Sequence, residues 1–277
     1  MPRPPIVNVM DRAARKAGRG LVRDFGEVEQ LQVSKKGAAD FVSAADLRAE
    51  ELLHAELMRA RPDFGFLGEE GSETTGNGHD RWIVDPLDGT SNFLHGIPQF
   101  AISIALETDG VLEAGVVYAP LTDELYWATR GQGAYLHDRR LRVSARRRLP
   151  EALIATGIPF MGRGDHPRYL ATMGHVMGQV AGIRRFGAAA LDLAWVAAGR
   201  CDGFWEYGLH PWDIAAGIVL VREAGGFVTD LEGRDGMLAS GDVLAANDQL
   251  HGPLLKMVRE SDPGPTPEAE TDAVKTP

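Results

Sequence analysis

Two aspartates at the end of a short apolar run are the residues of this chain best suited to chemistry. Residues 82–84 predict a buried strand that stops at Asp85, because Pro86 cannot donate to a sheet ladder. Asp88 follows, and residues 89–92 (Gly-Thr-Ser-Asn) predict a turn into a helix start, whose N–H groups point outward. The stretch combines hard oxygen ligands for a cation with a backbone cradle for an anion, and magnesium-assisted phosphate chemistry needs both.

The same stretch also fits an ordinary corner of a fold. Asp-Pro and Asp-Gly pairs are common turn formers, so a strand–turn–helix corner explains 85–92 equally well. Three further acidic residues stand at comparable places: Glu69 follows Gly68 at the end of a predicted strand, and Asp46 and Asp213 lie in the first turns of predicted helices. Each has a structural explanation of its own, since a carboxylate in a first turn complements the helix dipole and Gly-Glu-Glu is often a solvated turn.

Composition narrows the class of protein. The 277 residues suffice for one large domain or two modest ones, and 44% hydrophobic with 25% charged residues is typical of soluble globular proteins. A net charge of −10 argues against general nucleic-acid binding and suits a protein that collects divalent cations. The single cysteine, Cys201, excludes an internal disulfide framework and predicts a cytoplasmic location. No apolar run approaches the length of a membrane span.

Hydrophobic spacing predicts helices and then an antiparallel meander in the first half. Thr108-Asp109-Gly110, between two apolar runs, indicates a hairpin. The expected elements are a helix over 6–24, a strand over 27–34, a mobile loop over 35–40, a helix from an N-cap at Ser43 to about Ala60, and strands over 64–67, 99–107, 111–118, 124–129 and 133–137.

From Glu151 the pattern changes to alternating strands and helices, which predicts an α/β half with some parallel pairing. The expected strands are 153–156, 182–186, 201–206, 227–229 and 243–245, and the expected helices are 167–181, 188–198 and 211–224. The chain is therefore divided near 142–150, into 1–145 and 146–260. Residues 261–277, rich in Pro, Glu, Thr and Asp, predict a disordered tail.

Three segments together resemble the signature segments of the inositol monophosphatase family. Members of this family are magnesium-dependent, lithium-sensitive phosphomonoesterases. They are Gly-Glu-Glu at 68–70, Trp-Ile-Val-Asp-Pro-Leu-Asp-Gly-Thr-Ser-Asn-Phe at 82–93 and Trp-Asp-Ile-Ala-Ala-Gly at 212–217. The resemblance runs from about Lys36 to Asn247 and is closest to the bacterial inositol-1-monophosphatases. It implies an α/β (α+β) fold, a layered α-β-α-β-α sandwich of the inositol monophosphatase/fructose bisphosphatase type, and a homodimer.

The resemblance also implies which residues bind two to three magnesium ions. Glu69, Asp85 and the carbonyl of Leu87 match the ligands of the first ion. Asp85, Asp88 and Asp213 match those of the second, so Asp85 would bridge the two. A third, weaker ion would be held largely through waters near Glu69.

Catalytic and substrate positions follow from the same match. Thr90 corresponds to the hydroxyl that orients the attacking water, with Asp46 as its hydrogen-bond partner, and Glu69 belongs to the same catalytic group. The N–H groups of Gly89 and Thr90 correspond to the phosphate cradle. The remaining substrate-binding positions are Asp88, Gly187, Ala189, Glu206 and Asp213.

The chemistry supports this layout independently. A phosphate monoester carries about two negative charges near neutral pH, so an attacking hydroxide is repelled, and clustered magnesium ions relieve that repulsion. Carboxylates from separated segments supply suitable ligands without cysteine or histidine. The eight histidines lack the spacing of a zinc site, and the chain shows no serine–histidine or cysteine nucleophile pattern. We therefore expect direct attack by water.

Substrate choice stays open at this point. Ala188 stands where well-studied relatives often carry threonine, and 157–165 does not match them closely. Histidinol phosphate, fructose 1,6-bisphosphate and 3′-phosphoadenosine nucleotides are alternative substrates. The segment 206–213 looks closest to inositol monophosphatases, in which the acid at the Glu206 position binds ring hydroxyls. The alternative is that Glu206 is a strand-end surface residue, and we prefer the substrate-binding interpretation.

A cluster of arginines between Arg139 and Arg148 suggests an alternative function that is not enzymatic. The cluster could be the binding surface of a nucleic-acid or protein-binding module. The alternative is a solvated hairpin and linker beside an acidic body, which we prefer. A catalytically silent relative is disfavoured, because every matched ligand position keeps an oxygen donor.

Overall fold

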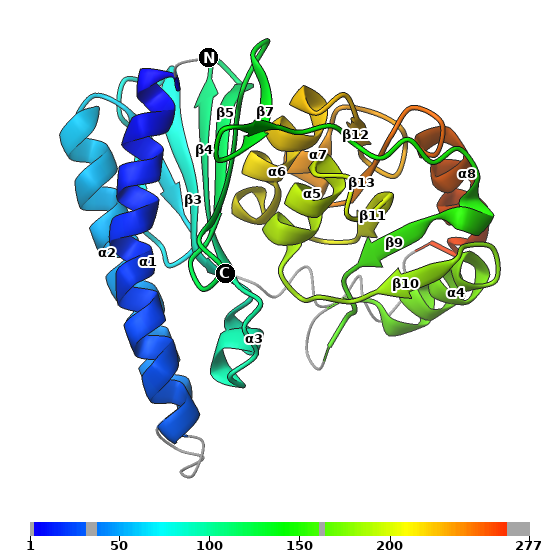
Figure 1. Cartoon of the computed structure of the whole chain (residues 1–277), viewed down its shortest axis with the longest axis horizontal. Helices are drawn as coiled ribbons and strands as arrows, with labels where there is room; N and C mark the ends of the chain where they lie inside the picture. The colour runs from blue at the N-terminus through cyan, green and yellow to red at the C-terminus, as the bar shows by residue number, and fades with distance from the viewer. Residues whose placement is uncertain (1–2, 32–37, 161–163, 265–277) are drawn as a thin grey trace.

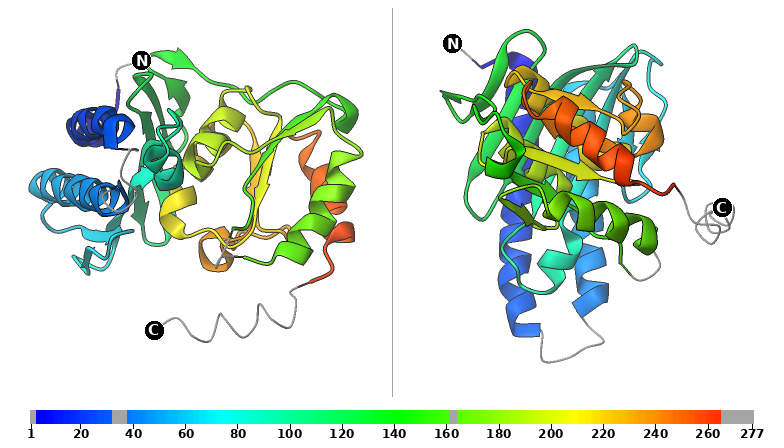
Figure 2. Two further views of the ribbon diagram at one scale, coloured as in Figure 1. Left: turned by 90° about the horizontal axis from the view of Figure 1, so that it is seen from below. Right: turned by 90° about the vertical axis from the view of Figure 1, so that its right-hand side faces the viewer.

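Two β-sheets alternate with three layers of helices (Figure 1). The computed structural model describes residues 3–31, 38–160 and 164–264. Seen end-on, the layers lie side by side (Figure 2), which confirms the predicted α-β-α-β-α sandwich. The outer layer on the first sheet consists of α1 (Pro5–Leu31) and α2 (Ala38–Ala60). The central layer consists of α5 (Ala189–Ala197) and α6 (Pro211–Glu223). The outer layer on the second sheet consists of α4 (His166–Met177) and α8 (His251–Ser261).

The first sheet has eight strands in the order β2-β1-β3-β4-β5-β6-β7-β8. Neighbours from β3 to β8 pair antiparallel as predicted, whereas β1 and β3 pair parallel. The predicted hairpin turn is present, with Asp109 and Gly110 both at positive φ. The strands are β1 (Gly65–Gly68), β2 (Glu73–Thr74), β3 (Asp80–Asp88), β4 (Ala101–Thr108), β5 (Val111–Ala119), β6 (Glu124–Thr129), β7 (Gly133–Leu136) and β8 (Arg139–Arg140).

The second sheet has five strands in the order β10-β9-β11-β13-β12. β9 pairs parallel with β10 and β11, and β13 pairs antiparallel with β11 and β12, so the expected partly parallel sheet is confirmed. Helices α7 and α8 were not anticipated. The strands and short helices are β9 (Leu153–Thr156), β10 (Gly182–Arg184), β11 (Gly203–Glu206), β12 (Phe227–Thr229), β13 (Val243–Ala246), α3 (Thr90–Leu94), α7 (Met237–Ser240) and the 3-10 helix η1 (Leu149–Glu151).

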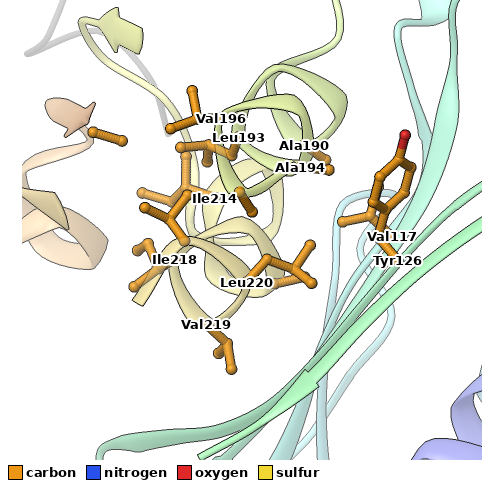
Figure 3. Packing of buried hydrophobic residues seen from close by; sticks show 14 of the residues in the cluster. Val117, Tyr126, Ala190, Leu193, Ala194, Val196, Ile214, Ile218, Val219 and Leu220 are labelled. Carbon is orange, nitrogen blue, oxygen red and sulfur yellow. The ribbon is translucent and has the colours of Figure 1, made fainter. Parts of the chain in front are cut away.

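One continuous apolar core runs from the first sheet through the central helices to the second sheet. Figure 3 shows Val117 and Tyr126 of the first sheet facing α5 and α6. The same cluster includes Phe204 and Val243 of the second sheet. Helix α6 is buried from Asp213 to Val221, because both sheets cover it. The central helices therefore belong to the cores of both halves.

Close packing of α6 on β5 makes Gly115 sensitive to substitution. A Cβ at Gly115 would lie 2.6 Å from the backbone oxygen of Ala216 and 2.9 Å from its Cα. We expect Gly115→Ala to lower the free energy of unfolding by about 1–3 kcal/mol, as overpacking does in tight cores. Urea unfolding measures the change. Gly20→Ala is the matched control, since a Cβ there meets nothing within 4 Å and helix propensity favours alanine. Equal stability of Gly115→Ala and the wild type would contradict the close approach.

The two N-terminal helices are longer than predicted. Helix α1 continues to Leu31, so the strand expected over 27–34 is wrong for residues 27–31, and residues 32–34 lie outside the described residues. Leu21, Phe25 and Val28 are all buried, and their spacing of four and three is helical. Packing against the first sheet therefore extends the helix.

Helix α2 begins at Ala38, within the stretch assigned to a mobile loop, and residues 35–37 lie outside the described residues. Ser43 lies inside α2, so it is not the N-cap that we predicted. Asp46 is about two turns past the helix start. The helix-dipole explanation for its carboxylate therefore does not apply.

Two further predicted boundaries are wrong. β3 does not stop at Asp85 but continues to Asp88, with an irregularity in its pairing to β4 between these residues. Pro86 lies within that irregularity, where the ladder does not require its missing N–H. The tail does not begin at Ser261, which ends α8, and Asp262 pairs with Arg168 at 2.6 Å. Residues 265–277 of the predicted tail lie outside the described residues.

The segment between the two sheets is held against the end of α6 and the residue that follows β13. The Asn247 side-chain amide donates to the carbonyl oxygens of Ser144 and Arg146, each at 2.9 Å. The Val143 N–H donates to the Ala224 carbonyl at 3.2 Å. The linker is thus pinned along its length. None of the helices in the described part of the chain is long and apolar enough to cross a membrane.

Candidate active site

A pocket of about 520 Å³ opens where the end of β3 meets the start of α5 and the end of β11. Almost all the residues assigned to the site from the sequence line it: Glu69, Asp85, Leu87, Asp88, Gly89, Thr90, Gly187, Ala189, Glu206 and Asp213. The remaining one, Asp46, is buried behind the pocket on α2. The structure therefore brings residues that are far apart in sequence into one place.

Local structure explains where each of the four carboxylates lies. Glu69 follows the last residue of β1, Asp85 and Asp88 lie at the end of β3, and Asp213 lies in the first turn of α6. Asp85 accepts from the Leu87 N–H at 2.9 Å, which is the short-range turn that Asp-Pro sequences favour. Asp213 accepts from the His210 N–H at 2.8 Å as part of a capping box.

Asp88 connects the two halves of the molecule. It accepts hydrogen bonds from the N–H groups of Ala189 at 3.2 Å and Ala190 at 2.8 Å. These are the first N–H groups of α5, which favour a negative charge. Ala189, one of the predicted substrate-binding positions, thus lines the pocket with its N–H bonded to Asp88.

Burial and mutual repulsion make these carboxylates hard to ionise. Burial raises the pKa of Asp85 well above its usual value, and the nearby carboxylates of Glu69, Asp88 and Asp213 raise it further. Burial also raises the pKa of Asp88, with Asp213 adding to the effect. The pKa of Glu69 rises to about 7, chiefly through burial. Crowded negative charge of this kind is relieved by a bound cation.

The donor set suits a hard divalent cation, although the side chains are not yet arranged around one. Within residues 3–31, 38–160 and 164–264, no three acidic, histidine or cysteine side chains stand as a ready metal-ligand group. Glu69 Oε2 is buried without a hydrogen-bond partner among the described residues. An orphaned carboxylate oxygen beside other carboxylates fits a cation.

Thr90 and Asp46 lie next to each other beside these acids. The Thr90 hydroxyl donates to the Leu87 carbonyl at 3.0 Å. It also contacts the Asp46 carboxyl. Burial is the main reason that the pKa of Asp46 is raised to about 8, and the hydrogen bond with Thr90 offsets part of that rise. A hydroxyl has one proton, so Leu87 and Asp46 compete for it. The predicted Thr90–Asp46 pair is therefore present, with an additional acceptor that the sequence did not indicate.

The turn at Gly89 depends on glycine. Its φ is 94°, in the left-handed region, and it precedes the first residue of α3. A Cβ here would lie 2.8 Å from the Gln99 carbonyl oxygen. The predicted turn into a helix start is thus present, and the first N–H groups of α3 have no acceptor inside the helix.

The opposite wall carries the residues expected to bind the rest of a substrate. Gly187 lies in the loop just before α5, and Glu206 is the last residue of β11. Glu206 raises the pKa of Asp88 by charge, so the two carboxylates lie within electrostatic range. Gly157 packs against Glu206, and a Cβ there would displace the Glu206 carboxylate from its present position.

Two site residues were missed from the sequence. The Asn92 amide donates to the carbonyls of Gln99 and Phe186, each at 2.8 Å, and so joins α3 to the loop before α5. Glu50 is 1% exposed and accepts two N–H groups of the segment that carries Glu69. The partners of Asn92 and Glu50 lie in other segments of the chain. The spacing of Asp46 and Glu50, one helical turn apart, could have indicated that Glu50 shares a helix face with a predicted site residue.

The arginine cluster is partly neutralised. Arg146 pairs with Asp202 at 3.1 Å, and Arg148 pairs with Glu151. Arg139 and Arg147 are exposed. The cluster lies on the β8 edge and the linker and contributes no residue to the pocket described above.

Comparison with known proteins shows the family of the chain. The model of the Inositol monophosphatase family matches residues 4–262. An inositol-1-monophosphatase of Rhizobium meliloti is 58% identical over 95% of this chain and 99% of its own length. A protein of Escherichia coli named Nus factor SuhB is 43% identical over 92% of this chain and 96% of its own.

A crystal structure of extragenic suppressor protein suhB from Bartonella henselae has the same architecture. It is 56% identical, covers 93% of this chain and 99% of its own, and superposes with a TM-score of 0.86. The layered fold, the acidic pocket and these matches lead to one assignment. This chain belongs to the inositol monophosphatase family and is a phosphatase of that family.

Proposed function

We propose that the protein hydrolyses inositol monophosphate to inositol and phosphate, using magnesium and a directly attacking water. The observation that carries the proposal is that Glu69, Asp85, Asp88 and Asp213, from three separate segments, line one pocket bordered by Thr90. Three relatives, 54–58% identical to this chain, are named inositol-1-monophosphatase, which supports the choice of substrate.

Two to three magnesium ions suit the donors of this pocket. Glu69, Asp85 and the carbonyl of Leu87 would hold one, and Asp85, Asp88 and Asp213 a second. A third would lie near Glu69. Carboxylate and carbonyl oxygens are the ligands that magnesium prefers. Bound there, magnesium would neutralise the phosphate, lower the pKa of a water and stabilise the leaving oxygen.

The side chains and backbone of the pocket then orient the reactants. The Thr90 hydroxyl accepts a hydrogen bond from the attacking water, and Asp46 fixes the direction of that hydroxyl. The N–H groups of Gly89 and Thr90 bind phosphate oxygens. Gly187 and Glu206 lie on the opposite wall of the pocket, where the polyol hydroxyls would bind.

A phosphatase panel tests the substrate. Inositol 1-phosphate, histidinol phosphate, fructose 1,6-bisphosphate and adenosine 3′,5′-bisphosphate are compared with magnesium and with a chelator. We expect the highest kcat/KM for inositol 1-phosphate and no turnover in the chelator. A higher kcat/KM for another compound would replace the substrate, and turnover in the chelator would remove the metal-dependent mechanism.

Glu206→Ala tests substrate recognition. A charged hydrogen-bond acceptor contributes about 1.5–3 kcal/mol, so kcat/KM for inositol 1-phosphate should fall about 10- to 100-fold. para-Nitrophenyl phosphate, which has no ring hydroxyls, is the control and should be hydrolysed as before. Equal losses for both substrates would show that Glu206 supports the pocket instead of reading the polyol.

The raised carboxyl pKa values predict how stability without metal depends on pH. Asp46 shifts from 3.8 to about 8 and Glu69 from 4.5 to about 7, so between these limits the native state holds protons that the unfolded state has released. Stability then falls as pH rises from about 4 to about 8. In chelator, the thermal midpoint should be lower at pH 8 than at pH 5.5. Magnesium should restore it, and Asp46→Asn should reduce the dependence to the part that Glu69 contributes. A chelated wild type with the same midpoint at both pH values would contradict the shifts.

A binding role is the second candidate function, because several relatives are named Nus factor SuhB. Its structural basis would be the exposed Arg139 and Arg147. Salt-dependent binding of RNA that is lost in Arg139→Ala/Arg147→Ala, with phosphatase activity kept, would support it. RNA binding unaffected by both substitutions would exclude this surface.

Assembly, location and inhibition complete the proposal. We propose a cytoplasmic homodimer that lithium inhibits by competing for the second magnesium position. Light scattering after size exclusion measures the mass of the assembly. Inhibition by lithium that magnesium concentration does not alter would contradict the shared position.

A further inference from the structure

Glu50 of α2 is a buried carboxylate with partners outside its own helix. It is 1% exposed. Its Oε2 accepts from the Glu70 N–H at 2.8 Å, and its Oε1 accepts from the Ser72 N–H at 2.9 Å. Both oxygens are therefore used to hold the segment 68–72, which we call the Glu69 loop.

The Glu69 loop closes tightly around this carboxylate. The Gly68 N–H donates to the Ser72 carbonyl at 2.9 Å, so the two ends of the loop meet. A Cβ at Gly68 would lie 2.6 Å from the Glu50 carboxyl carbon. Glycine at this position is thus explained by the approach of Glu50, and the loop has little freedom around it.

The same helix face also carries Asp46, one turn earlier. Asp46 and Glu50 are spaced by four, which places both on one side of α2. Asp46 contacts Thr90, and Glu50 holds the N–H group next to Glu69. A single rigid helix therefore fixes two parts of the pocket relative to each other.

We propose that Glu50 is a positioning residue that sets where Glu69 presents its carboxylate to the bound cation, a role that rests on the proposed magnesium-dependent activity. Hydrogen bonds from outer residues orient metal ligands, and their loss costs about 10- to 100-fold in metal affinity. Glu50 provides two such bonds to the backbone on one side of Glu69. It acts through geometry and does not itself contact the cation.

Glu50→Asp separates position from charge. Aspartate keeps the charge but is one methylene shorter, so it cannot reach both N–H groups. Magnesium titrated into the full chain by calorimetry should bind about 10- to 100-fold more weakly than to the wild type. Hydrogen exchange gives a second readout: the Glu70 and Ser72 amides should exchange faster. A role through charge alone predicts unchanged affinity in Glu50→Asp and a loss in Glu50→Gln.

Glu56→Asp is the matched control on the same helix. Glu56 is also buried, and it pairs with Lys16 at 2.6 Å, away from the pocket. This variant should unfold at a lower temperature yet bind magnesium as the wild type does. If Glu50→Asp fails to fold, hydrogen exchange of Glu50→Gln keeps the test. The positioning role predicts faster exchange at one of the Glu70 and Ser72 amides, because the side chain keeps a single acceptor, whereas a role through charge alone predicts unchanged exchange at both.

The outcomes separate the two proposals. Magnesium affinity in Glu50→Asp equal to the wild type, or weakened equally in Glu56→Asp, overturns the positioning role alone. Failure of the wild type to bind magnesium overturns the proposed function itself. Weaker magnesium binding in Glu50→Asp together with faster exchange at Glu70 and Ser72 supports both.

Discussion

Asp85→Asn is expected to reduce turnover by roughly 10³-fold or more while the fold remains intact. Loss of a residue that only supports a metal ligand already lowers metal affinity or activity about 10- to 100-fold. Asp85 is itself a proposed ligand, and it lies within electrostatic range of Glu69, Asp88 and Asp213. Asparagine occupies the same space but cannot supply the negative charge. Steady-state kinetics with inositol 1-phosphate and saturating magnesium measure the effect.

The same substitution should not destabilise the metal-free protein. Burial raises the pKa of Asp85 well above its usual value, which means that its charged form is unfavourable in the fold. A neutral side chain removes that cost, so the thermal midpoint of Asp85→Asn in chelator should equal or exceed that of the wild type at pH 8. Asp109→Asn, in the exposed hairpin turn, is the control for activity. Full activity of Asp85→Asn would remove the proposed mechanism.

Thr90→Ala should lower kcat about 10²- to 10⁴-fold, the range over which a positioned proton-transfer or orienting group acts. KM should change little, because the N–H groups of the Gly89 turn remain to bind phosphate. The reason is geometric: without the hydroxyl, nothing links the attacking water to Asp46. Single-turnover measurements separate the chemical step from binding.

Ser91→Ala is the neighbouring control, since this exposed side chain follows Thr90 on the same short helix. It should retain kcat close to that of the wild type. A Thr90→Ala effect confined to KM would contradict the assigned role, as would equal losses of kcat in the two variants.

The placement of the site residues was predictable where it is local. Asp85, Asp88, Gly89 and Thr90 lie within six consecutive residues, so their relative placement follows from one strand end and one turn. The hairpin at Asp109 is similarly local, because its two positive φ angles are set by the residues in the turn. The order of the five layers followed only from the family resemblance.

What the sequence could not indicate depends on contacts between distant segments. From the sequence alone, Val28 fits a strand. In the structure it lies on helix α1, where packing against the first sheet buries it. Glu50 and Asn92 look like ordinary surface polar residues, yet their partners lie in another element. Periodicity reports which face of an element is apolar, and it carries no information about which backbone N–H group a buried side chain will meet.

The shared central helices have a consequence for any attempt to divide the chain. A fragment ending near residue 145 would lack α5 and α6, leaving Val117 and Tyr126 uncovered on the face of its sheet. The complementary fragment would expose the other side of the same helices. Neither piece would hold a closed interior. The protein should therefore melt in one cooperative transition, and separately expressed halves should be soluble only when they reassociate.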